Sequence, residues 1–310
     1  MCYTKVNIDL LIPVKREWKL KKSEGIMTKT KAKFWKKCVA VFVGLTMLMG
    51  MPGEVVYAEV DGAEVSYSTD GGATWKGGSL MDAVYAGYGA DQCEIKLLRN
   101  IILNANGTDA NWSVGQVLAS SGETLVIDGQ GSYSLIRGDM DTLLMSVATE
   151  DSTVILKNII IDGGAVWNGE VPELRENSGK KQEGNGQLIS VHSGGTLILE
   201  SGAVLQNNVL TADGFAGVVE VGNGSTGTLI MKDGAKICNN AAVSGAGVDI
   251  RADGIFRMGG GEIYGNYASK YGGAVWTAAG CFLCQAVRYV IMSQKMQGAD
   301  CAYRIVESRG

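Results

Sequence analysis

The chain has 310 residues, of which 44 are glycine, three are proline and one is histidine. Apolar residues make up 46% of the chain, which excludes an intrinsically disordered protein. The abundance of glycine excludes a compact helical protein, because glycine is costly inside helices. It indicates short strands joined by tight turns. A single histidine excludes a metal site built from several histidines.

The charges divide the chain into three regions. Residues 1–58 contain 11 Lys/Arg and 4 Asp/Glu, residues 59–279 contain 13 and 26, and residues 280–310 contain 4 and 2. The charge balances are +7, −13 and +2, so an acidic body lies between two basic ends. An acidic body repels phosphate groups, and we therefore expect no nucleic-acid partner.

Residues 27–58 have the layout of a secretory signal peptide, in which five lysines precede an apolar stretch of 14 residues, Cys38–Met51. We expect this segment to be removed on export. The protein would then be secreted or on the cell surface and would meet the membrane only during export. An uncleaved membrane anchor is the alternative. Residues 1–26 form a doubtful leader, because either Met27 is the true start or the basic region is unusually long.

A repeated segment runs through the acidic body. Five copies begin at residues 123, 152, 195, 227 and 254, and they read ETLVIDG, STVILKN, GTLILESGAVLQNN, GTLIMKDGAKICNN and GIFRMGGGEIYGN. Their aligned positions are 29, 43, 32 and 27 residues apart, and the longest spacing contains a charged insertion at residues 167–186. Periods of this length indicate a repeat architecture.

Each copy alternates with the periodicity of a strand that has one buried face. The inward-facing positions are expected to be Leu125, Val154, Leu197, Leu229 and Phe256 and, two residues later, Ile127, Leu156, Leu199, Met231 and Met258. A second strand follows in the later copies and a third precedes each copy. The pattern therefore predicts an all-β fold, a parallel β-helix with three strands per rung over residues 94–280.

Asparagines recur at one corner of the predicted solenoid, where Asn208, Asn240 and Asn266 end successive copies. Asparagine tolerates left-handed turn geometry, and its amide can bond to the asparagine above and below. Ligand binding is the alternative interpretation of such a row. We interpret the three residues as a structural ladder that stabilises the turns.

The segments that flank the repeats differ from them. Residues 79–89 read SLMDAVYAGYG with helical spacing, so residues 59–93 are expected to hold a short helix that caps the first rung. Residues 281–310 contain three of the seven cysteines, and we interpret them as an aberrant tail from a shifted reading frame or a truncated gene. Metal or redox chemistry at Cys281 and Cys284 is less favoured, because neither a second cysteine pair nor a histidine accompanies them.

The signal segment, the helix followed by EIKLL, the LVIDG turn and the GTLxxxxGAxIxNN copies resemble a known group of proteins. They are similar to the right-handed parallel β-helix surface proteins of Gram-positive bacteria, described as adhesin-like, in the pectate-lyase-like superfamily. The resemblance covers roughly residues 60–280. It implies a right-handed solenoid and says less about activity, because this fold carries lyases, hydrolases and non-catalytic surface proteins.

One outward face combines charged and aromatic side chains. Its residues, in rung order, are Ser190, His192, Glu220, Asp249, Arg251, Ala274 and Trp276. The alignment places Ala274 next to Asp249, and it places Glu220 and Asp249 on neighbouring strands, which lie about 4.8 Å apart. Such exposed carboxylates could serve a retaining glycosidase, with Trp276 stacked on the sugar. They could also hold Ca²⁺ for a lyase, with Arg251 as the proton acceptor.

We favour a binding surface over catalysis at this face, because charged residues on an outward strand face are what solubility requires. The interpretation is a monomeric, non-catalytic module without a resident cofactor or metal, which binds a glycan or a surface protein. The alternatives are a polysaccharide lyase or glycoside hydrolase, and a truncated product without function. The residues expected to contact a ligand are His192, Trp276, Trp167 and Trp112.

Overall fold

The computed structural model describes residues 62–104, 122–138, 143–167, 172–174, 186–210, 217–277, 280–284 and 293–294. All of them belong to the second of the two units into which the chain divides, residues 59–310. The predicted leader and signal segment, Trp112 and most of the predicted tail lie outside the described residues. Within these ranges, no helix is long and apolar enough to cross a membrane.

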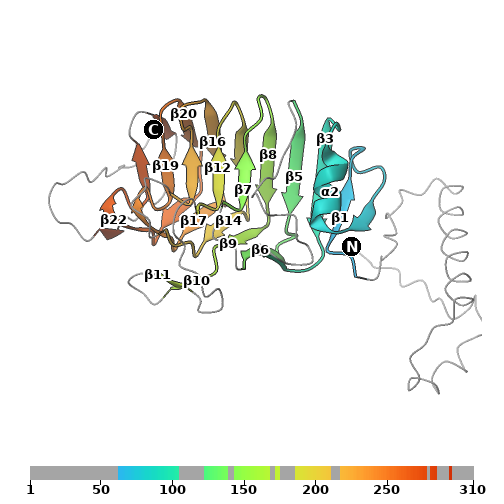
Figure 1. The fold of residues 1–310 in the computed structure, drawn as a ribbon, viewed down its shortest axis with the longest axis horizontal. Helices are drawn as coiled ribbons and strands as arrows, with labels where there is room; N and C mark the ends of the chain where they lie inside the picture. The colour runs from blue at the N-terminus through green and yellow to red at the C-terminus, as the bar shows by residue number, and fades with distance from the viewer. Residues whose placement is uncertain are drawn as a thin grey trace, which may run out of the picture. The chain divides into compact units, whose positions relative to one another are not determined.

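The described residues form a mostly parallel, all-β solenoid of about five turns with few helices (Figure 1). Its largest sheet, sheet A, contains in spatial order β2 (Lys76–Gly78), β1 (Val65–Ser68), β3 (Gln92–Leu97), β5 (Thr124–Asp128), β8 (Thr153–Lys157), β13 (Thr196–Leu199), β16 (Gly227–Met231), β20 (Gly254–Met258) and β24 (Cys281–Cys284). Strand β24 continues this stack beyond residue 280, where the sequence analysis places the start of a tail.

Two further parallel sheets form the other long faces. Sheet B contains β21 (Glu262–Tyr264), β17 (Lys236–Cys238), β14 (Val204–Gln206), β9 (Ile160–Asp162), β6 (Ser134–Arg137) and β4 (Ile101–Leu103). Sheet C contains β23 (Val275–Thr277), β19 (Val248–Ile250), β15 (Val219–Val221), β12 (Ile189–Val191) and β7 (Met145–Val147).

Two small sheets were not predicted from the sequence. One is a parallel sheet of β18 (Ala241–Ser244), β22 (Tyr267–Tyr271) and β25 (Ser293–Gln294). In the chain, β18 and β22 each lie between a strand of sheet B and a strand of sheet C, and β25 follows β24 of sheet A. An antiparallel hairpin joins β10 (Ala165–Trp167) to β11 (Pro172–Leu174) inside the charged insertion. The repeat alignment missed both, because these segments have no counterpart in every copy.

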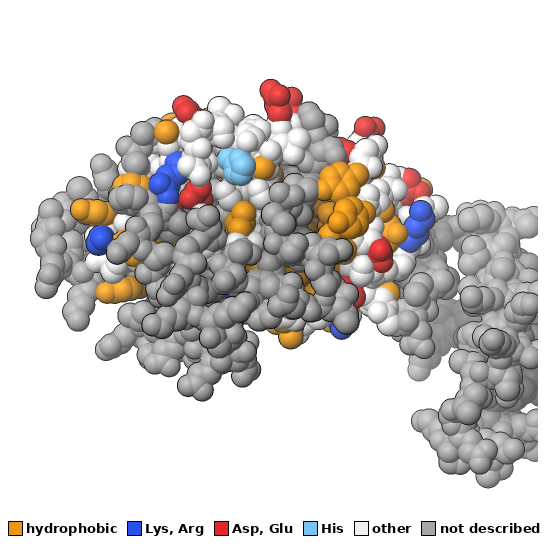
Figure 2. Space-filling view, in the orientation of Figure 1, with side chains coloured by type: hydrophobic (Ala, Val, Ile, Leu, Met, Phe, Trp, Pro, Cys, Tyr) orange, Lys and Arg blue, Asp and Glu red, His pale blue; other side chains and the backbone are white. Residues whose placement is uncertain are grey.

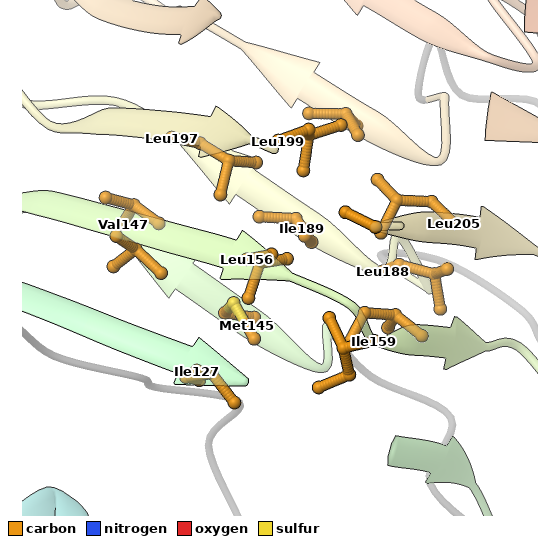
Figure 3. Close-up of a cluster of buried hydrophobic side chains, with 14 of the residues drawn as sticks. Ile127, Met145, Val147, Leu156, Ile159, Leu188, Ile189, Leu197, Leu199 and Leu205 are labelled. Atoms are coloured by element: carbon orange, nitrogen blue, oxygen red, sulfur yellow. The ribbon is translucent and has the colours of Figure 1, made fainter. Parts of the chain in front are cut away.

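The register of sheet A confirms the alignment of the five copies. Thr124 pairs with Thr153, Thr153 with Thr196, and Thr196 with Thr228, and Ile255 lies opposite Thr228 in the next strand. All ten predicted inward-facing positions of these strands are buried. Figure 3 shows how the apolar side chains of successive rungs stack into one column. Burying one such side chain contributes about 1.5–3 kcal/mol, so this column is the main source of stability.

Helix α2 (Leu80–Gly87) lies beside β1 and β3 at the first turns of the solenoid (Figure 1). It begins with a capping box, in which Ser79 Oγ accepts a hydrogen bond from the Asp82 amide and the Asp82 carboxylate accepts one from the Ser79 amide. Its buried face is formed by Leu80, Ala83, Val84 and Gly87. Tyr88 shares the predicted helical spacing, but it follows the last turn and faces solvent.

The asparagines at the corner after sheet B are buried and linked by hydrogen bonds. The amide of Asn208 donates to Asn240 Oδ1 (2.9 Å), and Asn240 Nδ2 donates to Asn266 Oδ1 (2.9 Å). Each is preceded by a residue with positive φ: Asn207 (57°), Asn239 (56°) and Gly265 (63°). The residue before each ladder asparagine therefore adopts the left-handed turn, and the buried asparagine that follows forms the ladder.

Candidate functional site on the outer face of sheet C

One column of outward side chains runs along sheet C. Strand pairing places Ser146, Ser190, Glu220, Asp249 and Trp276 at the same register position in five successive strands. The last member of this column corrects the sequence alignment, which placed Ala274 there.

The backbone explains the correction. The Val248 amide donates to the Ala274 carbonyl (2.9 Å), which sets Val275 opposite Val248 and directs Ala274 inward, where it is 1% exposed. Trp276 therefore neighbours Asp249 directly, and the aromatic ring and the carboxylates share one face of the sheet.

The two carboxylates of this column are buried, although the sequence analysis expected an exposed pair. Glu220 is 5% exposed and Asp249 has no exposed surface. Part of the cover comes from the turn before β19, because a Cβ added to Gly245 would lie only 3.0 Å from Asp249 Cβ. Gly245 has a φ of +58°, so both its backbone conformation and this close approach favour glycine. Alternation along a strand cannot reveal such a cover, because the covering turn lies before β19 and outside the alternating residues.

A single arginine pairs with both carboxylates. Arg251 Nε lies 2.8 Å from Asp249 Oδ2, and its Nη2 lies 3.4 Å from Glu220 Oε2. Gln187 Nε2 donates a hydrogen bond to the same Glu220 oxygen (3.1 Å). Asp249 Oδ1 is buried and accepts no hydrogen bond within the described part of the chain. We call Glu220, Asp249 and Arg251 the ion-paired cluster, in which one positive charge faces two carboxyl groups.

Burial is the largest influence on the pKa values of the two carboxyl groups, Asp249 and Glu220. It raises the pKa of Asp249 to about 6, and the nearby Glu220 charge adds to this rise while Arg251 opposes it. Burial also raises the pKa of Glu220, against the opposing influence of Arg251, Gln187 and His192. Both shifts have the same origin: a carboxylate removed from water is costly when its counter-ion is shared.

The other residues predicted to contact a ligand are distributed unevenly. His192 is half-buried beside this column, with Nε2 3.5 Å from Ser146 Oγ and Nδ1 2.9 Å from Ser193 Oγ. Figure 2 shows the chain's one histidine, in pale blue, on the same face as acidic and basic side chains. Trp276 is also half-buried. Trp167 lies in the β10–β11 hairpin, and its side chain is outside the described part, as is all of Trp112.

The residues of the ion-paired cluster do not fit a Ca²⁺ ion. Within the described ranges, no group of three or more His, Cys, Asp or Glu side chains could hold a metal. The Arg251 guanidinium also occupies the space beside both carboxylates and would repel a cation there. A calcium-dependent lyase mechanism therefore gains no support from this geometry.

Gln187 is the residue of this site that the sequence analysis missed. It lies two residues before β12, whereas the aligned positions before β15 and β19 are the small residues Gly217 and Ala246. A long polar side chain at a position where the next two rungs carry small residues was a signal for a special contact, and its Nε2 donates a hydrogen bond to Glu220.

Comparison with known proteins adds no relative. No protein-family model matches the chain, and neither a curated protein nor a solved structure matches it. The fold is thus established by the strand pairing, and the function must be argued from the outer face of sheet C.

Proposed function

We propose that this protein is an exported, non-catalytic β-helix module that binds a glycan or a surface protein through the outer face of sheet C. In this proposal the solenoid is right-handed, has three strands per rung and is capped at its first rung by α2. The observation that carries the binding function is the position of Trp276. Trp276 is the register neighbour of Asp249 in sheet C, on the face that also presents His192.

Burial of the carboxylates supports binding over turnover. A retaining glycosidase needs two carboxyl groups that reach opposite sides of the sugar carbon. Asp249 has no exposed surface, and both Asp249 and Glu220 pair with Arg251. In this arrangement the carboxylates orient the guanidinium. The ligand contacts are then left to the half-buried Trp276 and His192 and to Arg251, whose side chain is 25% exposed.

These three groups suit a neutral glycan. An indole ring offers an apolar face on which a sugar ring can stack, and it also carries a hydrogen-bond donor. A guanidinium donates several hydrogen bonds in a fixed plane, and imidazole can donate or accept at the sugar hydroxyls. The acidic body of the protein disfavours a polyanionic ligand.

Replacing Trp276 by alanine tests this proposal. On an array of neutral plant and bacterial glycans, we expect the full chain to bind at least one class and Trp276→Ala to weaken that binding about fivefold, because one aromatic contact contributes about 1 kcal/mol. Trp276→Phe is the matched control and should retain most of the affinity. Undiminished binding by a folded Trp276→Ala variant would contradict the proposal.

A polysaccharide lyase or glycoside hydrolase is the second candidate, and the raised pKa of Asp249 favours it. A carboxyl group with a pKa of about 6 beside a second carboxyl resembles the acid of an acid–base pair. Release of reducing ends from a polysaccharide panel, abolished by both Glu220→Gln and Asp249→Asn, would establish this activity and overturn the non-catalytic proposal. We expect no release above background from the wild-type chain.

A truncated product without function is the third candidate. Such a chain would not unfold cooperatively, whereas the continuous apolar column predicts a single cooperative transition. A thermal melt followed by circular dichroism distinguishes the two.

A further inference from the structure

Two tyrosines are exposed side by side at the C-terminal end of α2, Tyr85 in its last turn and Tyr88 directly after it. Tyr85 is 57% exposed and Tyr88 is 39% exposed, and their ring centroids lie 6.0 Å apart with 33° between the ring planes. Figure 2 shows hydrophobic side chains gathered over the position of α2. We call this pair the tyrosine platform. It lies at the C-terminal end of α2, which packs beside β1 and β3, whereas the ion-paired cluster lies on sheet C.

The platform rests on a rigid base. Leu80, Ala83 and Val84 are buried beneath the helix, and a Cβ added to Gly87 would lie 3.0 Å from Cys93 Cβ, so the helix packs closely onto β3. The capping box at Ser79 holds the first turn. Side chains on a fixed helix lose little conformational entropy when they bind, which favours recognition by the two rings.

The space beside Tyr88 is open and bounded by a carboxylate. Gly89 has a φ of +79°, and a Cβ added there would meet no atom within 4 Å. Its amide donates a hydrogen bond to Glu123 Oε1, which anchors this turn to the strand β5 region. Burial and the nearby Tyr85 and Glu123 raise the pKa of Tyr88, so its hydroxyl remains protonated and can both donate and accept at neutral pH.

The local charge decides which ligands fit. The exposed residues around the platform include Asp82 and Asp91, and residues 77–95 contain neither lysine nor arginine. A polyanionic ligand would be repelled.

The angle between the two rings argues against a cationic ligand. A quaternary ammonium is usually enclosed by aromatic walls that meet at steep angles. Two rings inclined by only 33° form a shallow, nearly continuous surface instead.

We infer that the tyrosine platform is a second binding site of this protein, for the flat face of a neutral sugar chain. The two rings would stack against consecutive apolar sugar faces, and the tyrosine hydroxyls would bind the sugar hydroxyls at the edge. This site does not depend on the function proposed for sheet C, because no residue is common to the two.

Binding of cellohexaose, maltohexaose and chitohexaose to the full chain, measured by isothermal titration calorimetry, tests the inference. We expect binding of at least one oligosaccharide and a loss of about tenfold or more in the Tyr85→Ala/Tyr88→Ala double variant. Tyr271→Ala, which removes a tyrosine that is 55% exposed on β22, is the matched control and should bind like the wild type.

Three results would overturn the inference. The double variant could bind all three oligosaccharides with unchanged affinity, the wild type could bind none of them, or tetramethylammonium chloride could bind at the platform instead. The outcome is separable from that for sheet C. If Trp276→Ala alone abolishes all sugar binding, the platform is excluded and the sheet C proposal stands. If only the tyrosine variant loses affinity, the platform stands as the sugar-binding site and the sheet C proposal is excluded.

Discussion

Replacing Asn240 by alanine is expected to lower the free energy of unfolding by about 3 kcal/mol, because three side-chain hydrogen bonds are lost at once, although Asn266 Oδ1 still accepts from the backbone amide of residue 240 (3.1 Å). Asn240 Oδ1 accepts a hydrogen bond from the backbone amide of Asn208 (2.9 Å). Its Nδ2 donates to the Leu205 carbonyl (3.3 Å) and to Asn266 Oδ1 (2.9 Å). Each buried group left without a partner costs about 1–3 kcal/mol, and no water can easily replace the amide inside the column.

Asn208→Ala is the matched control for this prediction. Asn208 occupies the same corner and is equally buried, but its Nδ2 has one partner, the Gly186 carbonyl (3.1 Å), and its Oδ1 has no partner within the described ranges. Its replacement should cost only about 1–2 kcal/mol. Urea unfolding of both variants measures the difference. Equal losses would show that the corner is stabilised by side-chain volume and not by the ladder.

Asp249→Asn is expected to stabilise the protein by about 2 kcal/mol at pH 7. Burial raises the pKa of Asp249 from an ordinary value of 3.8 to about 6 in the folded protein. Native Asp249 therefore binds its proton more tightly than it does in the unfolded chain. The stabilising contribution of the protonated form is complete below about pH 4 and is lost as the pH rises through 6. An amide cannot ionise, so the variant avoids this loss.

The measurement is the free energy of unfolding in urea at pH 4, 5, 6, 7 and 8 for the wild type and the variant. Their difference should grow between pH 4 and pH 6 and stay constant above pH 7. Asp253→Asn is the control, because Asp253 is exposed and its φ of +64° is tolerated by asparagine. A variant less stable than the wild type at pH 7 would mean that the ion pair with Arg251 outweighs the burial of Asp249.

Much of the fold could be predicted from the sequence because a solenoid repeats the same alternation of inward and outward residues in every rung. Alternation identified Leu197, Leu199 and Leu229 as inward, and the spacing of the copies aligned Thr196 with Thr228, as the strand pairing confirms. Each rung contacts mainly its neighbours, so a periodic sequence carries the information that a globular fold would distribute over distant segments. The small sheet of β18, β22 and β25 escaped detection because it is confined to the later copies.

Only part of the candidate site could be predicted from the sequence. Its residue types and the pairing of Glu220 with Asp249 followed from the alignment and agree with the register. The neighbour of Asp249 could not be predicted in this way. Ala274 and Trp276 are two residues apart and both fit a short apolar strand, so the alignment chose Ala274 where the register has Trp276. The contact from Gln187 also depended on a segment before the strand.

The sequence by itself determined the parallel solenoid, its inward columns and its acidic body, since these depend on the local alternation and spacing of residue types. Only the tertiary structure decided that Glu220 and Asp249 are buried, that they share Arg251, and that Tyr85 and Tyr88 are exposed side by side at the end of α2. The physical reason is that burial and counter-ion sharing are properties of neighbours. Gln187, Glu220 and Arg251 belong to three successive rungs, and their side chains come together only when the chain is folded.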